Sequence, residues 1–276
     1  MSLFDAFGYK GKRALVVGGA TGMGAAAAEL AQDAGAEVVV MDRAEVTLPG
    51  VKAIRLDLSD KASIDAAVEE CGGPVHALFS CAGVADGTPG IERINFIGHR
   101  HLIDRALEAD LLPRGAAIAM ISSAAGLGWE PNLDLLKEYL DTPDFDSAVT
   151  WIEAHPGRND YMWSKQAICT YVARQALALQ KRGLRINAIL PGPTDTPLAR
   201  ANEDLWLGTG ADYRAEVGIA ASTPEEQAGP LVFLCSDAAR YVNGITMITD
   251  AGWVGSGVTG SFPPATQMVD FLYGRL

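Results

Sequence analysis

The chain has 276 residues and carries 22 Lys and Arg against 34 Asp and Glu, which gives a formal net charge of −12 at pH 7. This acidic balance argues against nucleic acid or an anionic membrane surface as a partner, because both require a basic patch to offset phosphate charge. With 49% hydrophobic residues, 20% charged residues and 30 Gly, the composition is typical of one well-packed globular domain. A small molecule or a protein remains as the partner.

Targeting and redox signals are weak in this chain. No run approaches the roughly 18 uninterrupted apolar residues of a membrane span, and residues 1–5 lack the basic and then apolar order of a signal peptide. We therefore expect a cytoplasmic protein. The cysteines are Cys71, Cys81, Cys169 and Cys235. They form no close pair and no metal-ligand spacing, so we expect reduced thiols and no metal site.

Short β-branched runs alternate with alanine-rich helical stretches along the chain. This alternation predicts parallel strands joined by crossover helices, which means a doubly wound sheet with helices on both faces. Seven strands are expected, at 14–17, 37–41, 53–56, 77–80, 116–121, 185–190 and 246–249. The main helices are expected at 24–34, 59–70, 96–111, 161–181 and 224–235. The prediction is a single α/β domain of the Rossmann type over residues 1–276.

Three segments interrupt this rhythm. Residues 126–158 contain two amphipathic patterns and predict a helical insertion that either adds to the core or forms an oligomer contact. Residues 197–222 predict a mobile apolar flap over a substrate. Residues 253–276 carry more aromatic side chains than a free end would expose, so we expect this tail to pack against another surface. The apolar residues of the flap are Leu198, Leu205, Trp206, Leu207 and Tyr213.

A glycine-rich turn follows the first expected strand. Gly18, Gly22 and Gly24 have the spacing G-x-x-x-G-x-G where a strand meets a helix. The missing side chains let the backbone approach a pyrophosphate, and the helix N-terminus supplies N–H groups and a positive dipole. The pattern predicts a dinucleotide site that includes Thr21 and Met23, and a tight turn without a ligand is the alternative.

An acidic residue ends the second expected strand. Asp42 stands where a carboxylate accepts hydrogen bonds from a ribose 2′-hydroxyl and repels a 2′-phosphate. This favours NAD over NADP, although the adjacent Arg43 would pair with a phosphate if Asp42 turned away. At the end of the third strand, Asp57, with Leu58 beside it, either binds the adenine amino group or caps the following turn.

A tyrosine and a lysine open the longest expected helix. Tyr161 and Lys165 lie four residues apart and so share one helical face. A phenol with a pKa of about 10 exchanges protons poorly at neutral pH, and an adjacent ammonium favours the phenolate, so the pair predicts acid–base chemistry. Ser123 follows a strand at the sheet edge where ligands bind, and its hydroxyl is suited to a substrate carbonyl. Asn95 begins a neighbouring helix, and a plain helix cap is the alternative for it.

These motifs, in this order, resemble those of the short-chain dehydrogenases/reductases. The resemblance rests on the glycine motif, Asp42, Asp57, Ser80-Cys81-Ala82-Gly83 in place of the family's Asn-Asn-Ala-Gly, Asn95, Ser123, Tyr161 with Lys165, and residues 191–196. It covers about residues 10–252. Short segments after Asp42 and Gly83, together with the long segment before Tyr161, resemble the bacterial 3α-hydroxysteroid dehydrogenase/carbonyl reductase branch.

The resemblance implies a catalytic tetrad. Tyr161 would act as acid and base, Ser123 would position the carbonyl or alcohol, Lys165 would bind the nicotinamide ribose and lower the tyrosine pKa, and Asn95 would hold a water molecule. The residues that the resemblance implies beside the cofactor are Cys81, Ala82, Gly83, Pro191, Gly192, Thr194 and Thr196. The pair Ser80-Cys81, where the family has two asparagines, implies a loss of polar bracing between the central strands.

The combined prediction is an NAD(H)-dependent oxidoreductase that interconverts a secondary alcohol and a ketone. A hydroxysteroid or another alicyclic compound is the expected substrate, with a monocyclic terpenoid or small cyclic alcohol as the alternative. A non-catalytic dinucleotide-binding regulator is the alternative of another class, but it has no need of all four tetrad groups. Trp163 is expected either in the core or in the wall of the site. The resemblance also implies a homodimer or homotetramer.

Overall fold

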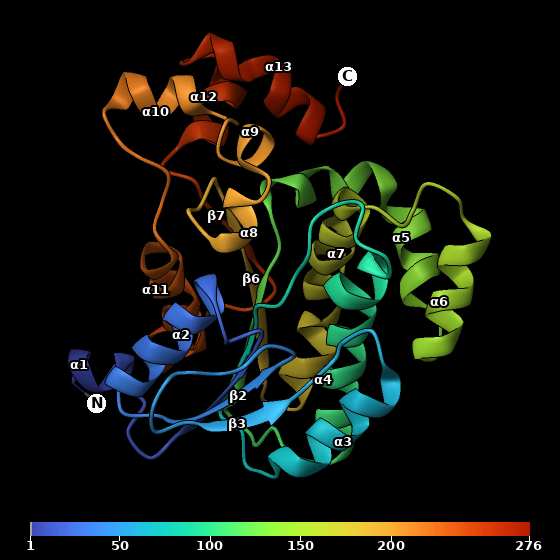
Figure 1. The fold of residues 1–276 in the computed structure, drawn as a ribbon, viewed down its shortest axis with the longest axis vertical. Coiled ribbons are helices and arrows are strands. Elements are labelled where there is room, and N and C mark those ends of the chain that lie inside the picture. Colours follow the sequence, from blue (N-terminus) through green and yellow to red (C-terminus); the bar gives the residue numbers. More distant parts are fainter. Residues whose placement is uncertain (1) are drawn as a thin grey trace.

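The computed structural model describes residues 2–276, apart from the side chains of Asp204 and Leu205. A parallel sheet lies at its centre, with strand order β3-β2-β1-β4-β5-β6-β7 (Figure 1). The strands are β1 (Arg13–Val17), β2 (Glu37–Asp42), β3 (Lys52–Arg55), β4 (Ala77–Ser80), β5 (Ala117–Ile121), β6 (Arg185–Pro191) and β7 (Thr246–Thr249). The predicted doubly wound fold is confirmed, and each strand boundary falls within one residue of its prediction.

Helices cover both faces of the sheet. They are α1 (Leu3–Phe7), α2 (Gly22–Asp33), α3 (Lys61–Cys71), α4 (Gly98–Glu108), α5 (Leu133–Leu140), α6 (Phe145–Ala154), α7 (Tyr161–Lys181), α8 (Pro197–Arg200), α9 (Glu203–Trp206), α10 (Ala211–Val217), α11 (Pro224–Cys235), α12 (Trp253–Thr259) and α13 (Pro263–Leu272). The chain also contains one π-helix, η1 (Arg93–Ile97), and two 3₁₀-helices, η2 (Ala124–Asn132) and η3 (Asp237–Ala239).

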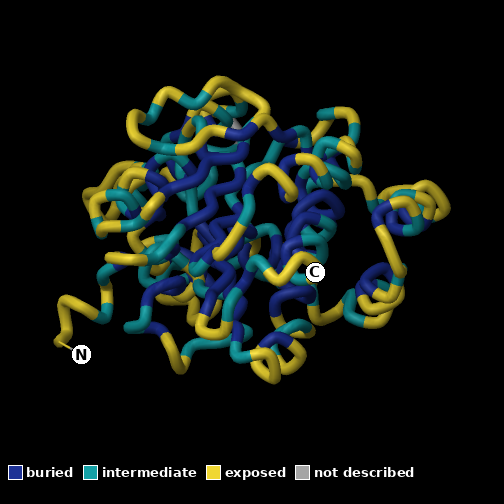
Figure 2. The backbone as a smooth tube through the Cα atoms, turned by 90° about the horizontal axis from the view of Figure 1, so that it is seen from below, coloured by how far each residue is buried: buried dark blue, intermediate teal, exposed yellow. Residues whose placement is uncertain are grey.

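The two faces of the sheet carry different cores because successive side chains of a strand point to opposite sides. On one face Leu15 and Met120 pack with α3, α4 and α7. On the other face small residues such as Ala14 and Ala117 face α2 and α11, and the alanines of α2 allow that helix to approach closely. Figure 2 shows the buried backbone gathered around the sheet, with exposed segments at the periphery.

The sheet also creates a crevice. The chain leaves β1 toward β2 and β3 on one side and returns to β4 on the other, so the connections diverge at the carboxyl ends of β1 and β4. In a doubly wound fold this divergence leaves room for a ligand. The glycine turn after β1 and residues 81–84 after β4 both lie at this edge.

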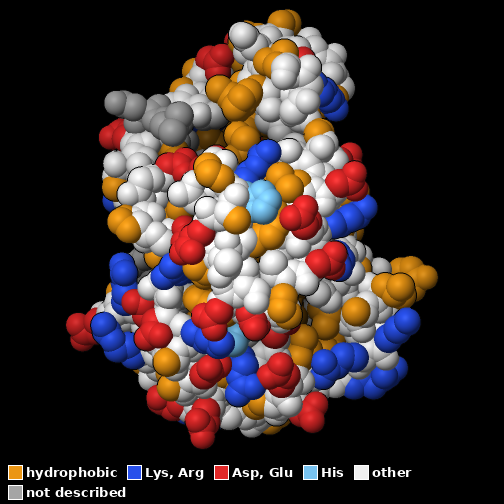
Figure 3. Space-filling model, turned by 90° about the vertical axis from the view of Figure 1, so that its right-hand side faces the viewer, with side chains coloured by type: hydrophobic (Ala, Val, Ile, Leu, Met, Phe, Trp, Pro, Cys, Tyr) orange, Lys and Arg blue, Asp and Glu red, His pale blue; other side chains and the backbone are white. Residues whose placement is uncertain are grey.

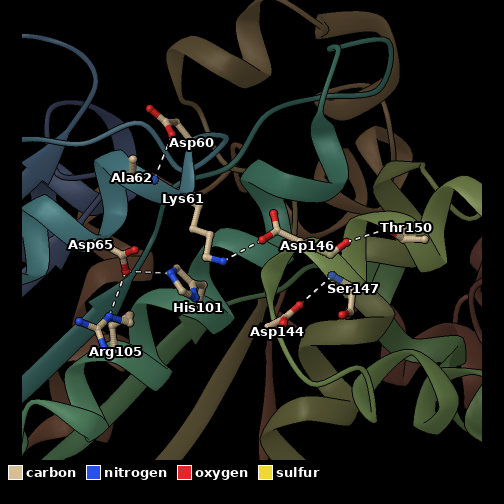
Figure 4. Close-up of polar contacts among 10 residues, drawn as sticks. All are labelled: Asp60, Lys61, Ala62, Asp65, His101, Arg105, Asp144, Asp146, Ser147 and Thr150. Atoms are coloured by element: carbon tan, nitrogen blue, oxygen red, sulfur yellow. Dashed lines mark hydrogen bonds and ion pairs between the residues drawn. The ribbon is translucent and has the colours of Figure 1, made fainter.

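The insertion adds to the core. Its helices α5 and α6 bury Leu136, Tyr139 and Trp151 in the same apolar cluster as α4 and α7. The rings of Trp151 and Trp163 stack with centroids 5.9 Å apart and planes within 7°. Trp163 is 3% exposed and therefore belongs to this core and not to the wall of the site. At the surface, the Lys61 ammonium pairs with the Asp146 carboxylate at 2.8 Å and joins α3 to α6 (Figure 4).

The flap and the tail form a third apolar cluster above the carboxyl edge of the sheet (Figure 1). Tyr213 of α10 packs with Trp253 of α12, and the ring of Phe262 meets Tyr213 edge to face at 5.2 Å. Val269 of α13 is fully buried in the same cluster, which also contacts η2 through Leu127. The tail is therefore packed against the body of the protein. Leu205, expected as part of the flap, lies outside the described side chains.

The surface charges, the hydropathy of the helices and the cysteines bear on what the protein can bind. On the face shown in Figure 3, acidic and basic side chains are interspersed over the lower part of the molecule. Within residues 2–276, no helix is long and apolar enough to cross a membrane. The described residues also contain no group of three or more His, Cys, Asp or Glu side chains arranged to hold a metal ion. All four cysteines are free, and three of them are buried.

Candidate active site

The glycine turn between β1 and α2 leaves no room for side chains. Gly18 has φ +83°, and a Cβ on it would lie 2.4 Å from the backbone nitrogen of Ala82. A Cβ on Gly24 would lie 2.0 Å from the carbonyl oxygen of Gly18. Gly22 has φ +58°, where side chains are strained, and it opens helix α2 two residues before the predicted start. The turn is thus folded tightly on itself and presents backbone to the crevice.

A cavity of about 480 Å³ lies in front of this turn. The residues predicted for the cofactor that line it are Gly18, Thr21, Gly22, Met23, Gly24, Asp42, Arg43, Asp57, Leu58, Cys81, Ala82, Gly83 and Thr196. They come from the ends of β1, β2, β3 and β4 and from the start of the flap. The N-terminus of α2 opens into the same cavity, so its N–H groups and dipole favour an anionic group there. An extended dinucleotide fits such a cradle.

Both oxygens of the Asp42 carboxylate are held by backbone. Oδ2 accepts a hydrogen bond from the N–H of Ala20 at 2.9 Å, and Oδ1 accepts one from the N–H of Ala44 at 2.8 Å. These contacts aim the carboxylate along the cavity edge beside the glycine turn. Arg43 is exposed and also lines the cavity, so the guanidinium remains available near the carboxylate.

Asp57 performs the capping role and lines the cavity as well. Its Oδ1 accepts hydrogen bonds from the N–H and the hydroxyl of Ser59, at 2.9 and 2.6 Å. These hydrogen bonds lower the pKa of Asp57. The two alternatives weighed from the sequence therefore do not exclude each other, since one carboxylate oxygen holds the turn while the side chain borders the cavity.

Five residues predicted for the cofactor lie outside the cavity lining, namely Tyr161, Lys165, Pro191, Gly192 and Thr194. Pro191 ends β6, and a Cβ on Gly192 would lie 2.9 Å from the Cβ of Asp250. The Thr194 hydroxyl donates to the carbonyl oxygen of Gly192 at 2.9 Å and lies 3.0 Å from the Ser222 hydroxyl. Residues 191–194 therefore contact other parts of the protein and not the cavity. The same segment places Thr196 in the cavity wall, close to Gly22.

The cavity also has lining residues that sequence reasoning did not single out. They are Val17, Met41, Ala44, Leu56, Val84, Ile94, Pro197 and Ala201, whereas Leu198, which also lines the cavity, was expected from the flap. Most are apolar and carry no chemical signature. Their only signal is adjacency, because most of them stand close in the chain to a residue that a motif had marked.

The tetrad residues meet where the cavity ends at Gly83. The Ser123 side chain lies close enough to the Tyr161 phenol to oppose the rise of its pKa. The Lys165 ammonium donates to the carbonyl oxygen of Ile121 at 3.0 Å and lies 5.3 Å from the centroid of the Tyr161 ring. A Cβ on Gly83 would lie 3.7 Å from Lys165 Nζ and 3.5 Å from Asn95 Oδ1, so Gly83 stands between the cavity and these buried groups.

Asn95 is not a helix cap. It is fully buried inside the π-helix η1, a type of turn often found at functional sites. Its Oδ1 accepts from the N–H of Val84 at 2.8 Å, and its Nδ2 donates to the carbonyl oxygen of Val84 at 3.0 Å. Nδ2 also lies 3.3 Å from the Ser164 hydroxyl. The amide therefore clamps the backbone after Gly83 to the start of α7.

Burial dominates the ionisation of the pair. It raises the pKa of Tyr161 to about 12, against the opposing effect of the Ser123 side chain, and it lowers the pKa of Lys165 to about 8. The expected lowering of the tyrosine pKa by the lysine is therefore not found. The ammonium lies 5.3 Å from the ring centroid, and the loss of hydration is the largest influence on the pKa of the phenol.

Two contacts of Tyr161 were missed from the sequence. Its backbone N–H donates to Oδ1 of Asp86 at 2.6 Å, and the Asp86 charge adds to the rise of the tyrosine pKa. Its ring packs against the ring of Trp206 from the flap. Neither partner stands at a motif position, and no spacing in the sequence joins them to Tyr161.

A buried histidine makes two polar contacts at the end of β4. His99 Nδ1 lies 2.6 Å from the Ser80 hydroxyl, and Nε2 lies 3.0 Å from the carbonyl oxygen of Ala82. Burial lowers the pKa of His99 to about 4, so the ring is neutral at pH 7. A neutral ring accepts from Ser80 through Nδ1 and donates to Ala82 through Nε2. His99 therefore ties α4 to the end of β4, and the expected loss of polar bracing between the central strands stays a prediction.

Comparison with known proteins now decides the family. Residues 12–133 match the family model described as short chain dehydrogenase, and residues 147–254 match the one described as Enoyl-(Acyl carrier protein) reductase. A 3-alpha-hydroxysteroid dehydrogenase/carbonyl reductase of Comamonas testosteroni is 30% identical over 250 residues, which cover 86% of this chain and 95% of that protein. The chain belongs to the short-chain dehydrogenase/reductase (SDR) family.

Other SDR proteins extend the comparison. A 2,5-dichloro-2,5-cyclohexadiene-1,4-diol dehydrogenase of Sphingobium indicum is 32% identical over 260 residues, covering 88% of this chain and 96% of that protein. The crystal structure of the 3-alpha-hydroxysteroid dehydrogenase from Pseudomonas sp. B-0831, complexed with NADH, is similar with a TM-score of 0.72 and 25% identity, covering 91% of this chain and 99% of that one. The resemblance to the hydroxysteroid dehydrogenase/carbonyl reductase branch is thus confirmed.

Proposed function

We propose that this SDR is an NAD(H)-dependent oxidoreductase that interconverts a secondary alcohol and a ketone. The observation that carries the proposal is the meeting of Ser123, Tyr161 and Lys165 at the end of the dinucleotide-shaped cavity. The hydroxyls of Ser123 and Tyr161 beside the buried Lys165 ammonium would move a proton to or from a carbonyl oxygen.

The cradle supports a nicotinamide dinucleotide as the cofactor. The backbone of the glycine turn and the N-terminus of α2 would hold the pyrophosphate through N–H groups and the helix dipole. The turn can fold this tightly because Gly18 and Gly24 have no side chains that would collide with backbone. Leu58 and Asp57 would border the adenine, and Gly83 and Thr196 would flank the nicotinamide end. When bound, the nicotinamide supplies the hydride chemistry.

The carboxylate of Asp42 supports NAD over NADP. Its two oxygens are oriented by the N–H groups of Ala20 and Ala44, and both retain lone pairs for a ribose hydroxyl. A 2′-phosphate at the same place would meet a fixed negative charge. Arg43 lines the cavity beside Asp42, but it is exposed and would offset that repulsion only in part.

Tyr161 exchanges the proton in this proposal. With a pKa of about 12 the phenol keeps its proton at neutral pH, so it is ready to donate to the oxygen of a ketone. Ser123 holds that oxygen through its hydroxyl. Lys165 would bind the nicotinamide ribose, and Asn95 would hold the backbone and a water molecule on the path by which the proton is replaced. In the direction of alcohol oxidation, Tyr161 must first lose its proton to that path.

We further propose an alicyclic alcohol or ketone, with a hydroxysteroid as the first choice and a monocyclic terpenoid or small cyclic alcohol as the second. The apolar cluster of the flap and tail beside the tetrad supports this, and so do the ring-bearing substrates in the names of two relatives. The free cysteines are consistent with a protein of the cytosol. A homodimer or homotetramer remains our proposal from the family resemblance.

The decisive experiment replaces the proposed acid. Tyr161→Phe should lower turnover of NAD⁺ with a panel of hydroxysteroids and cyclic alcohols by about 10²- to 10⁴-fold, since that is the usual contribution of general acid–base catalysis. Binding of NAD⁺ should persist. The same change at the fully exposed Tyr241 is the matched control and should leave turnover unchanged. Full turnover by Tyr161→Phe would exclude the role proposed for this residue.

A further inference from the structure

The flap contacts the proposed acid directly. Trp206 ends the short helix α9, and the centroid of its ring lies 5.0 Å from that of Tyr161, with the planes inclined at 46°. This geometry is a tilted aromatic contact at a centroid distance that is usual for packed rings. Trp206 is only half-buried, so part of the indole still faces open space beside the tyrosine.

The chain on both sides of Trp206 is anchored. On the N-terminal side the Thr196 hydroxyl accepts from the N–H of Ala199 at 3.1 Å, and Arg200 forms an ion pair with Asp195 at 2.6 Å. On the C-terminal side Arg214 donates to the carbonyl oxygens of Leu207 and Thr209.

The tail secures the C-terminal anchor. The Tyr213 hydroxyl donates to the carbonyl oxygen of Ala251 at 3.0 Å, and its ring packs in the cluster with Trp253. The indole of Trp206 is thus placed by contacts spread over the flap and the tail, and its position against Tyr161 does not depend on a single neighbour.

This placement constrains a substrate. Its oxygen must reach the hydroxyls of Tyr161 and Ser123, because these are the groups proposed to hold it and to exchange its proton. The carbon skeleton attached to that oxygen then extends past the Tyr161 ring, where Trp206 stands. An indole face is a broad apolar surface that makes good contact with the C–H groups of a rigid ring. An open chain makes the same contact only by losing rotational freedom.

We infer that Trp206 determines substrate specificity in this site by packing against the six-membered carbocycle that carries the reacting carbon. The inference rests on the proposed function and deepens it, because it explains why a cyclic alcohol would be preferred to an open-chain alcohol of the same size. Trp206 is not required for proton transfer, since it offers no group that exchanges a proton at neutral pH.

The test compares two secondary alcohols with six carbons each, cyclohexanol and 2-hexanol, at saturating NAD⁺. The wild type should prefer cyclohexanol. Trp206→Ala should lower kcat/KM for cyclohexanol about tenfold more than for 2-hexanol, since aromatic packing of this kind is usually worth about one factor of ten. The loss should appear mainly in KM. Trp206→Phe retains an aromatic face and should keep most of the preference.

Binding supplies a second readout. The dissociation constant of cyclohexanol from the enzyme–NADH complex should rise in Trp206→Ala by a similar factor, while that of 2-hexanol changes little. Phe271→Ala, an exposed aromatic residue of α13 at 52% exposure, is the matched control and should leave the ratio between the two alcohols unchanged. Unaltered NAD⁺ binding shows that each variant is folded.

The outcomes separate the two proposals. An equal loss for both alcohols in Trp206→Ala, or an unchanged ratio, would overturn the specificity role while leaving the proposed dehydrogenase intact. If the wild type binds NAD⁺ but oxidises no alcohol of the wider panel, the proposed function fails, and the inference on Trp206 fails with it.

Discussion

The cofactor half and the substrate half of this SDR are built by different means. Around β1 and α2 the site is made of backbone, and Gly18 and Gly24 are required because a single added carbon would collide with main-chain atoms. Around the flap and tail the site is made of side chains such as Trp206 and Tyr213, held by contacts between distant segments. A site made of backbone requires particular residues, such as glycine, at fixed positions. A site made of packed side chains tolerates many combinations of apolar residues of similar total volume.

The strongest way to test this contrast is to add one carbon to the backbone cradle. Gly24→Ala should abolish measurable NAD⁺ binding or lower it by at least about 100-fold, because its Cβ would lie 2.0 Å from the Gly18 carbonyl oxygen. Gly229→Ala is the matched control in helix α11, where nothing lies within 4 Å of the new carbon. It should raise the free energy of unfolding by up to about 1 kcal/mol. Titration with NAD⁺ and urea denaturation measure both effects, and normal binding by Gly24→Ala would refute the backbone argument.

The buried His99, which contacts Ser80 and Ala82 at the end of β4, predicts that the stability of the protein depends on pH. The pKa of His99 is about 4 when folded and about 6.5 when unfolded, so between these values the unfolded chain binds more protons. The free energy of unfolding should therefore fall as the pH drops from about 6.5 to 4, by up to about 3 kcal/mol from this group.

A variant without the imidazole isolates that contribution. His99→Leu leaves the Ser80 hydroxyl without its partner and should cost about 1–3 kcal/mol at pH 7. It should also lose stability less steeply in acid than the wild type does. Urea denaturation at several pH values measures both slopes, and parallel slopes would show that His99 does not govern the acid response.

The preference for NAD⁺ over NADP⁺ tests whether the side chain of Asp42 contributes to a cofactor site that is otherwise made of backbone. Asp42→Asn removes the negative charge and retains a side-chain oxygen for the nearby N–H groups. The ratio of kcat/KM for NAD⁺ over NADP⁺ should fall by at least about tenfold, because the repulsion of a 2′-phosphate is gone. Glu45→Gln makes the same charge change at an exposed position nearby and should leave the ratio almost unaltered. A ratio that does not move in Asp42→Asn would assign cofactor choice to another group.

The smallest effect is expected at Asp86, which tests how a charge near Tyr161 influences catalysis in the substrate half. Asp86 raises the pKa of Tyr161 by its charge and accepts the tyrosine N–H. Asp86→Asn should therefore shift the rise of alcohol oxidation with pH toward lower pH, by less than about one pH unit because the carboxylate is exposed. The shift should shrink further in high salt. Asp86→Ala removes the hydrogen bond as well and should reduce kcat, so the two variants separate charge from positioning. A shift toward higher pH would contradict the assigned sign.

Much of the cofactor half could be predicted from the sequence because its determinants are local. The glycine spacing, the alternation of strands and helices, and Asp42 at a strand end depend on short-range conformation and on the rule that ligands bind at the carboxyl edge of a parallel sheet. The same reasoning placed Ser123 near Tyr161. It was less successful with Thr194, because a hydroxyl beside a motif is as well suited to internal hydrogen bonds as to a ligand.

Periodicity and backbone conformation are set by near neighbours in the chain, so the α/β fold, the glycine turn and the residue types of the tetrad could be read without a structure. The contacts of His99 with Ser80, of Asp86 with the N–H of Tyr161, and of Trp206 with the Tyr161 ring follow from the tertiary structure alone. The same holds for the pKa of Tyr161, because burial depends on every segment packed around the phenol. These pairs come from distant segments, and their contact follows from the strand order and the packing of flap on tail, which no spacing in the chain encodes.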